Sequence, residues 1–279
     1  MGLQKLVFLL CAVVVCSIAA QPLSVRSVKV SLPGVAPHSF EKDEDVLLSV
    51  NKLTSIRTQM PFDYYSLPYC KPASVTQEGE NVGEVLAGDR IENSVYQLAM
   101  KQEKACEVLC AVQLSKDQSI QFVRAIDDEY RVHWIVDNLP VGVHATTPTG
   151  ADTFERGFPV GFHTGKNGDA SSRHYINNHI RIIVQYADDE LQDGDEEEDR
   201  TSKIIGFRVE PKSLAHEDQS LKPGKISPDC KKLLQNDWGR EDGFQGVDAV
   251  GTSVLFTYDV VWEMTTTPWT NRWDAYVVV

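Results

Sequence analysis

Apolar and polar residues alternate over several stretches of this 279-residue chain, a pattern typical of strands with one buried face. The longest alternation lies near the carboxyl end, where residues 254–264 carry apolar side chains at every second position. Shorter stretches with the same period centre on residues 46–50, 132–136, 180–186 and 205–209. Turn-forming prolines, glycines and asparagines separate them. The pattern predicts a mostly β, sandwich-like fold with one or two short helices.

One helix is predicted from Lys116 to Asp128. Ser115 precedes it as an N-cap residue, and Gln118 occupies the position that completes a capping box. The apolar residues that follow have helical spacing: Ile120, Val123 and Ile126.

The first twenty residues have the layout of a secretory signal peptide. Lys5 precedes a continuous apolar run from Leu6 to Cys16, and small residues follow as far as Ala20. This run is shorter than the roughly 20 residues that a membrane-spanning helix needs. We therefore expect cleavage after Ala19 or Ala20, which leaves residues 21–279 as a lumenal domain.

Glycines and prolines interrupt the periodicity between residues 140 and 172. This segment has two interpretations that the sequence leaves open, a junction between two sub-domains or a long ordered loop.

The net charge of −13 argues against nucleic acid as a partner, because phosphate binding needs a basic face. Nine of the twelve residues from Asp188 to Asp199 are acidic, which predicts a solvated loop between two strands. Weak calcium binding is the alternative interpretation of this acidic loop, although its spacing is not that of an EF-hand.

Four of the six cysteines remain after signal cleavage, and an oxidising lumen predicts two disulfides among them: Cys70, Cys106, Cys110 and Cys230. Residues 106–114 alternate as a strand, in which residues four apart are separated by about 13 Å. Cys106 and Cys110 would then each pair with Cys70 or Cys230, whereas a helix would let them pair directly. A zinc site is the competing hypothesis, but the usual Cys/His spacing is missing.

Catalytic motifs are not complete anywhere in the chain. The segment Gly161–Asn167 has three residues between its glycines where a phosphate-binding loop needs four, so we expect a turn-forming loop. The Gly251–Ser253 stretch lacks the second glycine of a nucleophile elbow. His174 and His179 are five apart, which suits neither a helical nor a strand metal site. We expect a protein that is not an enzyme, with no cofactor, no metal and no small-molecule substrate.

The segment Asn51–Cys70, NKLTSIRTQMPFDYYSLPYC, resembles the lumenal signature of the nonaspanins, also called the transmembrane nine superfamily or endomembrane protein 70 family. Further segments resemble the family in the same order: Asn81–Ser94, Tyr130–Pro140, Gly157–Phe162, Tyr175–Ile180, Gly206–Ser213 and Phe256–Tyr276. Their motif residues, which we expect to be structural, are Tyr64, Tyr65, Pro68, Asp89, Trp134, Asp137, Asn138, Pro140, Asn177, Asn178, Trp262, Arg272, Trp273 and Asp274.

This resemblance implies a protein of Golgi and endosomal membranes that sorts or localises other membrane proteins, with this domain in the lumen. Its clients would bind through nine membrane helices, and none of these follows Tyr276. We therefore expect a fragment, a truncated gene model or a shortened isoform. The alternative is a free secreted or lumenal soluble binding module. Trp262, Trp269 and Trp273 suit either a bilayer surface or ordinary packing.

Overall fold

The structure is a computed structural model that describes residues 37–77, 89–146, 152–165, 172–189, 200–228, 230, 243–248 and 251–276. These residues all belong to one compact unit, Pro37–Val279. The predicted signal peptide, residues 81–88 of one family-like segment and residues 190–199 of the acidic loop lie outside the described residues. Within the described ranges, no helix has the length and apolarity needed to cross a bilayer.

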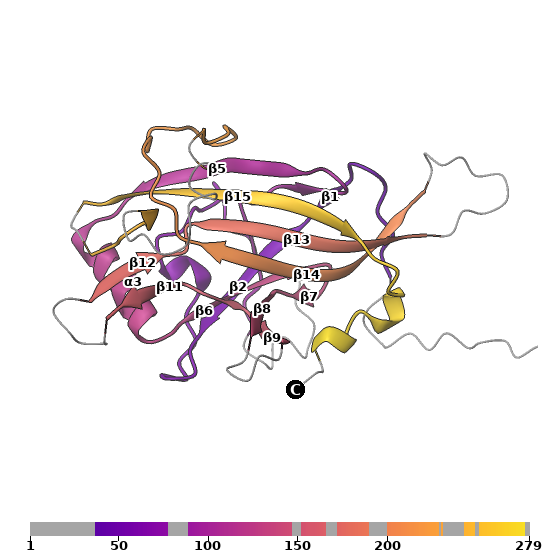
Figure 1. Ribbon diagram of the computed structural model, residues 1–279, viewed down its shortest axis with the longest axis horizontal. Coiled ribbons are helices and arrows are strands. Elements are labelled where there is room, and N and C mark those ends of the chain that lie inside the picture. Colours follow the sequence, from indigo (N-terminus) through magenta and orange to yellow (C-terminus); the bar gives the residue numbers. More distant parts are fainter. Residues whose placement is uncertain are drawn as a thin grey trace, which may run out of the picture. The chain divides into compact units, whose positions relative to one another are not determined.

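Two larger sheets carry most of the strands (Figure 1). The six-stranded sheet has the order β5 (Lys104–Gln113), β15 (Ser253–Met264), β13 (His179–Asp188), β14 (Ser202–Lys212), β8 (Gly142–Thr146) and β9 (Asp152–Arg156). The five-stranded sheet has the order β10 (Phe158–Pro159), β6 (Arg131–Val136), β2 (Leu48–Thr54) and β3 (Glu92–Asn93), and β7 (Leu139–Pro140) pairs with β6.

Smaller elements complete the described part of the fold. Two strand pairs stand apart from the larger sheets: β1 (Asp45–Val46) with β4 (Leu98–Ala99), and β11 (Gly161–Thr164) with β12 (Arg173–Ile176). The helical elements are α3 (Lys116–Asp127) and the single 3-10 turns η1 (Tyr64–Ser66), η4 (Trp269–Asn271) and η5 (Asp274–Tyr276). The mostly β fold predicted from the sequence is confirmed.

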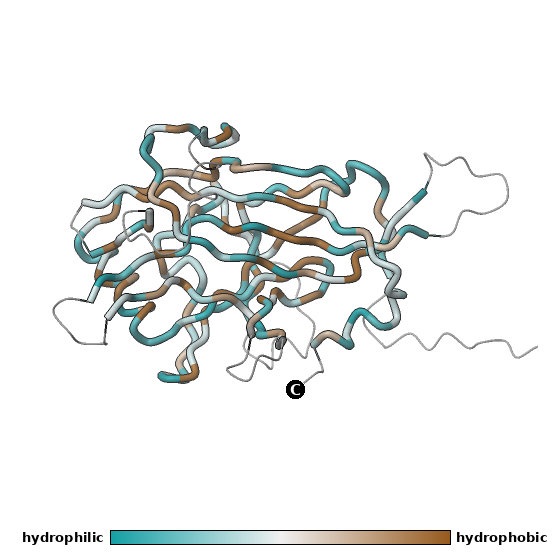
Figure 2. The backbone as a smooth tube through the Cα atoms, viewed as in Figure 1, coloured by the Kyte–Doolittle hydropathy of each residue, from teal (hydrophilic) through white to brown (hydrophobic). Residues whose placement is uncertain are grey.

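Aromatic rings join the two larger sheets in the core. Trp134 of β6 and Tyr258 of β15 are each 1% exposed, and both rings contact Tyr96, at centroid distances of 4.5 and 5.4 Å. Hydrophobic residues run along the long central strands (Figure 2). Burial of such large rings is a major source of folding free energy, because each removes about 150–250 Å² of surface from water.

The predicted capping box at the start of α3 is present. Ser115 accepts a hydrogen bond from the Gln118 amide, and the Gln118 side chain accepts one from the Ser115 amide. The buried face of the helix differs from the face that the apolar spacing predicts, because Ile120 is 39% exposed. The helix instead buries a stripe that includes two small residues: Ser119, Phe122, Ala125 and Ile126.

In its described residues, the segment 140–172 contains the short strands β8 to β11. The prediction of a turn-forming loop at Gly161–Asn167 is wrong for its first four residues, which form β11 and pair with β12. A Cβ atom at position 161 would lie 2.1 Å from the Tyr175 carbonyl oxygen. Gly161 therefore serves the close approach of two backbones and not a turn.

Candidate functional site

Two disulfides are present, Cys70–Cys110 and Cys106–Cys230, with Cα–Cα distances of 5.9 and 6.0 Å. The two predicted disulfides are confirmed. Cys106 and Cys110 both lie on strand β5, and each pairs with a cysteine outside that strand. One bridge ties the segment after η1 to β5, and the other ties Cys230 to it.

The strand pairing breaks at Cys106. Its backbone has φ of 51°, a conformation that residues other than glycine rarely adopt, and the register of β5 and β15 shifts between Tyr258 and Val260. The Cys106 amide donates to Asp259 Oδ1 at 2.6 Å instead of to a strand carbonyl. Its carbonyl accepts from the Ser227 amide at 2.9 Å. A bulge of this kind re-aims a side chain, here the Cys106 sulfur.

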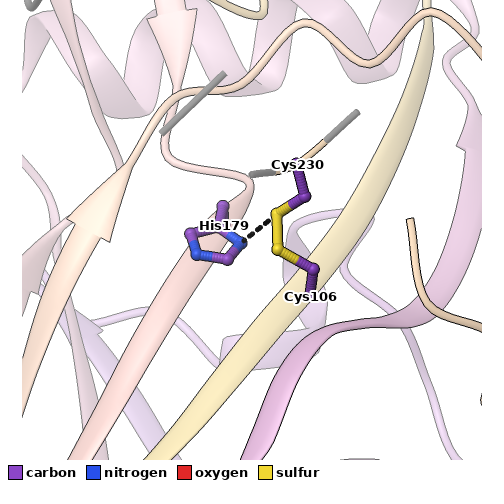
Figure 3. A group of neighbouring side chains, drawn as sticks. All are labelled: Cys106, His179 and Cys230. Atoms are coloured by element: carbon purple, nitrogen blue, oxygen red, sulfur yellow. Dashed lines mark hydrogen bonds between the residues drawn. A yellow bond between two sulfur atoms is a disulfide. The ribbon is translucent and has the colours of Figure 1, made fainter. Parts of the chain in front are cut away.

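His179 lies beside the Cys106–Cys230 bridge (Figure 3). It is the first residue of β13, its side chain is fully buried, and parallel pairing with β15 sets it opposite Thr257. Its Nδ1 atom lies 2.9 Å from Thr257 Oγ1 and 3.8 Å from Cys230 Sγ. Its Nε2 atom lies 3.5 Å from Asp259 Oδ2. Carboxylate, imidazole and sulfur therefore follow one another in contact.

A second histidine extends this arrangement. His216 Nε2 lies 3.2 Å from Thr257 Oγ1, and His216 Nδ1 lies 3.0 Å from Ser227 Oγ. These three residues are at most 5% exposed. We call this group the His179 cluster, with the members Cys106, His179, His216, Ser227, Cys230, Thr257 and Asp259.

Asp259 supplies negative charge to the cluster. Burial by itself raises the pKa of its carboxyl group, but the hydrogen bond and charge of His179, together with the Cys106 amide, outweigh burial and hold the pKa below its ordinary value. The sulfurs of Cys106 and Cys230 are bonded to each other, so neither is the thiolate that binds a metal. In this oxidised form the cluster is suited to stabilising charge beside a sulfur.

Comparison with known proteins decides the family. The sequence model of the endomembrane protein 70 family matches residues 61–279. The chain belongs to this family. It is similar to transmembrane 9 superfamily member 10 of Arabidopsis thaliana, with 37% identity over 255 residues, and to member 4 of Homo sapiens, with 36% identity over 264 residues. These alignments cover 89% of this chain and 38% and 39% of the relatives, so the chain spans about two fifths of their length.

In this endomembrane protein 70 chain, several of the family-motif residues lie in packing positions. Tyr64 stacks on Tyr69 at a centroid distance of 4.6 Å, and the Tyr65 hydroxyl donates to the Asn93 carbonyl. Trp134 is core, and Asp89 forms an ion pair of 2.9 Å with the Lys52 side chain.

Two hydrogen-bonded asparagines stand just before His179. Asn178 is 1% exposed, donates from Nδ2 to the carbonyls of Leu214 and Leu255, and accepts from the Leu214 amide. Asn177 donates to the Pro159 carbonyl at 2.9 Å. The pair fixes β13 at the point where the His179 cluster begins.

Among the carboxyl-terminal motif residues, Arg272 contacts the β6–β7 turn. Arg272 pairs with Asp137 in that turn, and both Asp137 and Asn138 have positive φ. Trp262 donates from Nε1 to the Gln102 carbonyl, and the Trp273 ring contacts Tyr276. Of the remaining motif residues, Pro68 lies two residues after η1, Pro140 lies in β7 and Asp274 begins η5.

The two histidines compared in the sequence have separate environments. His174 Nδ1 lies 2.7 Å from Asp248 Oδ1, and Nε2 lies 3.0 Å from Asp127 Oδ1. Burial lowers the His174 pKa, but these two hydrogen bonds and the carboxylate charges outweigh it and raise the pKa. Sequence reasoning missed this pair of carboxylates, because Asp127 and Asp248 come from distant segments.

Proposed function

We propose that this chain is the lumenal portion of a protein that sorts other membrane proteins, or holds them in particular membranes of the Golgi and endosomal system. The observation that carries the proposal is family membership across most of the chain, since the endomembrane protein 70 match extends over residues 61–279. The clients are membrane proteins, bound through the part of the relatives' length that this chain does not span.

Two features support a lumenal position for this domain. The residues before position 21 have the charge and apolar layout of a signal peptide. Both disulfides require an oxidising compartment, which the secretory lumen provides and the cytosol does not.

We further propose a binding role and not that of a hydrolase. In the described ranges, the hydroxyl groups that contact histidine in the His179 cluster are those of Thr257 and Ser227, and both residues are 1% exposed. A nucleophile buried to this degree has no access to substrate without movement of the chain.

The test is deletion of the protein in its native cells, followed by surface biotinylation and quantitative mass spectrometry of membrane proteins. We expect a defined set of membrane proteins to change surface level, and re-expression of the whole protein to restore them. Normal surface delivery of all membrane proteins, with none recovered in a pull-down, would count against sorting.

The same cells test the lumenal position and the form of the protein. An antibody to residues 188–199 is used to blot carbonate-washed membranes and soluble fractions. A membrane-retained band well above 31.2 kDa, protected from protease in sealed vesicles, is the expected result. A soluble band near the size of the chain would instead favour a free lumenal or secreted binding module.

A further inference from the structure

We propose that the Cys106–Cys230 disulfide is a thiol–disulfide exchange site for a protein dithiol, with Cys230 as the leaving sulfur and His179 as the group that stabilises its thiolate. This activity goes beyond membrane-protein sorting. Exchange at this bridge requires a group that stabilises the leaving sulfur and a route for the attacking thiol. The other disulfide should lack the stabilising group.

The stabilising group is His179. Its Nδ1 atom lies 3.8 Å from Cys230 Sγ, and the contact drawn in Figure 3 is to this sulfur. Its Nε2 atom faces the Asp259 carboxylate at 3.5 Å. An imidazole that gives a hydrogen bond or a proton to a cysteine sulfur stabilises the thiolate, and a thiol of lower pKa leaves faster in exchange.

The exchange takes place in two steps, one for each thiolate of the partner. A thiolate of the partner dithiol attacks Cys106 Sγ, the new S–S bond forms there, and the Cys106–Cys230 bond breaks with its electron pair on Cys230. The second thiolate of the partner then attacks the partner's own sulfur in the mixed disulfide and releases Cys106 as a thiolate, which takes up a proton. The protein gains two electrons, and the partner becomes a disulfide.

Access to the bridge does not require opening of the main core. Cys106 and Cys230 form a separate small cluster of buried apolar residues with Leu214, whereas Cys70 belongs to the main core. We call residues 214–227 the cover segment: its residues 224–227 pair with the backbone of residues 106–108 beside the bridge. Most of residues 217–226 are exposed, with Ile226 67% exposed. Local opening of such a segment costs less free energy than global unfolding.

The backbone at Cys106 adds an independent observation. Its φ of 51° is an uncommon conformation for a residue with a side chain, and such residues gather at functional sites. The Asp259 carboxylate holds this conformation through the Cys106 amide while its other oxygen faces His179. One carboxylate thus positions both the attacked cysteine and the histidine.

The charged and titratable groups around His179 come from three parts of the chain. Asp259 faces it from β15, and His216 is joined to it through the Thr257 hydroxyl. Arg181 acts on Asp259 by its charge. The Cys70–Cys110 bridge lines a pocket together with Lys71 and Glu107 but with no histidine among the described residues, which makes it an internal control for the effect of His179.

The experiment measures both disulfides at equilibrium. The full chain, expressed through the secretory pathway, is equilibrated in buffers of reduced and oxidised dithiothreitol, alkylated, digested and analysed by mass spectrometry. We expect Cys106–Cys230 to become reduced under more oxidising conditions than Cys70–Cys110. In His179→Gln we expect the equilibrium constant for reduction of Cys106–Cys230 to fall about tenfold, or about 30 mV, with Cys70–Cys110 unchanged.

Two further variants keep the proposal falsifiable if His179→Gln is not secreted. Asp259→Asn keeps an acceptor for the Cys106 amide but removes the charge facing His179, and we expect a shift in the same direction. His174→Gln changes a buried histidine outside the cluster. It should leave the midpoint of reduction of each disulfide unchanged. Equal midpoints for the two wild-type disulfides, or no shift in either cluster variant, would overturn the proposal.

Discussion

The guanidinium of Arg272 donates to the Asp137 carboxylate at 2.5 Å, and the two side chains are only 1% and 8% exposed. Asp137 lies in the turn between β6 and β7, and Arg272 directly follows η4. The Arg272 guanidinium also stacks on Trp269, with its central carbon 4.5 Å from the ring centroid. This buried pair therefore fastens the carboxyl-terminal described segment to the five-stranded sheet.

Removal of one partner from this pair should leave a buried charge uncompensated. We expect Asp137→Ala to lower the free energy of unfolding by about 3–5 kcal/mol, measured by urea denaturation. The matched control is Glu210→Ala, because Arg181 and Glu210 form a pair in which both side chains are about 40% exposed. That change should cost no more than about 1 kcal/mol. Equal effects of the two variants would contradict the role given to the buried pair.

His174 should make stability depend on pH. Its pKa in the folded protein is raised above the ordinary value of about 6.5 by Asp248 and Asp127. The stabilisation is therefore complete below about pH 6.5 and is lost as pH rises through the folded pKa. We expect His174→Gln to destabilise the protein more at about pH 5.5 than at about pH 8.5.

Urea denaturation at the two pH values checks this prediction. The groups facing His174 are Asp127 from α3, Asp248, and the ring of His163 on β11 at a centroid distance of 5.9 Å. The control is His144→Gln, since His144 is exposed. A His174→Gln effect that is the same at both pH values would refute the assignment.

Gly161→Ala should force β11 away from β12, because the new Cβ atom would lie 2.1 Å from the Tyr175 carbonyl oxygen. We expect a loss of about 1–3 kcal/mol in the free energy of unfolding. Gly243→Ala is the matched control, since a Cβ atom at that position would have no neighbouring atom within 4 Å and the backbone φ is not positive. The control should stay within about 0.5 kcal/mol of the wild-type protein.

Sequence patterns predicted those elements that depend only on residues close together along the chain. The capping box of α3 depends on Ser115 and Gln118 alone, and the period of the long strands follows from burial of one face. The buried face of α3 was not predictable from apolar spacing, because the elements that pack on the helix select it. Small residues there, such as Ser119, allow close contact although they are not apolar.

The His179 cluster depends on contacts between distant residues. Period-two alternation places Thr257 and Asp259 on the face of β15 opposite its apolar residues, which suggests exposure to solvent. The sheet order instead sets Thr257 opposite His179, and the bulge at Cys106 turns its amide toward Asp259. Sheet order and bulges are properties of the whole fold, so only the cysteine count hinted at this site.

Asn178 should hold the start of the cover segment, residues 214–227. It is 1% exposed, and its side chain makes three hydrogen bonds, two of them to the backbone of Leu214 and one to the Leu255 carbonyl. Asn178→Ala leaves these buried backbone groups unsatisfied, and each such group costs about 1–3 kcal/mol. We therefore expect a large loss of stability and faster hydrogen exchange at the amides of Leu214 and Ser227.

Asn177→Ala is the matched control, because among the described residues the adjacent side chain donates to the Pro159 carbonyl alone, on the five-stranded sheet side of the fold. It should cost less and should leave exchange at Ser227 unchanged. The Ser227 amide donates to the Cys106 carbonyl, so its exchange reports directly on the cover of the disulfide. If Asn178→Ala sped exchange equally throughout β13 and β14, the asparagine would be supporting the sheet as a whole, and the cover segment would not be a separate unit of opening.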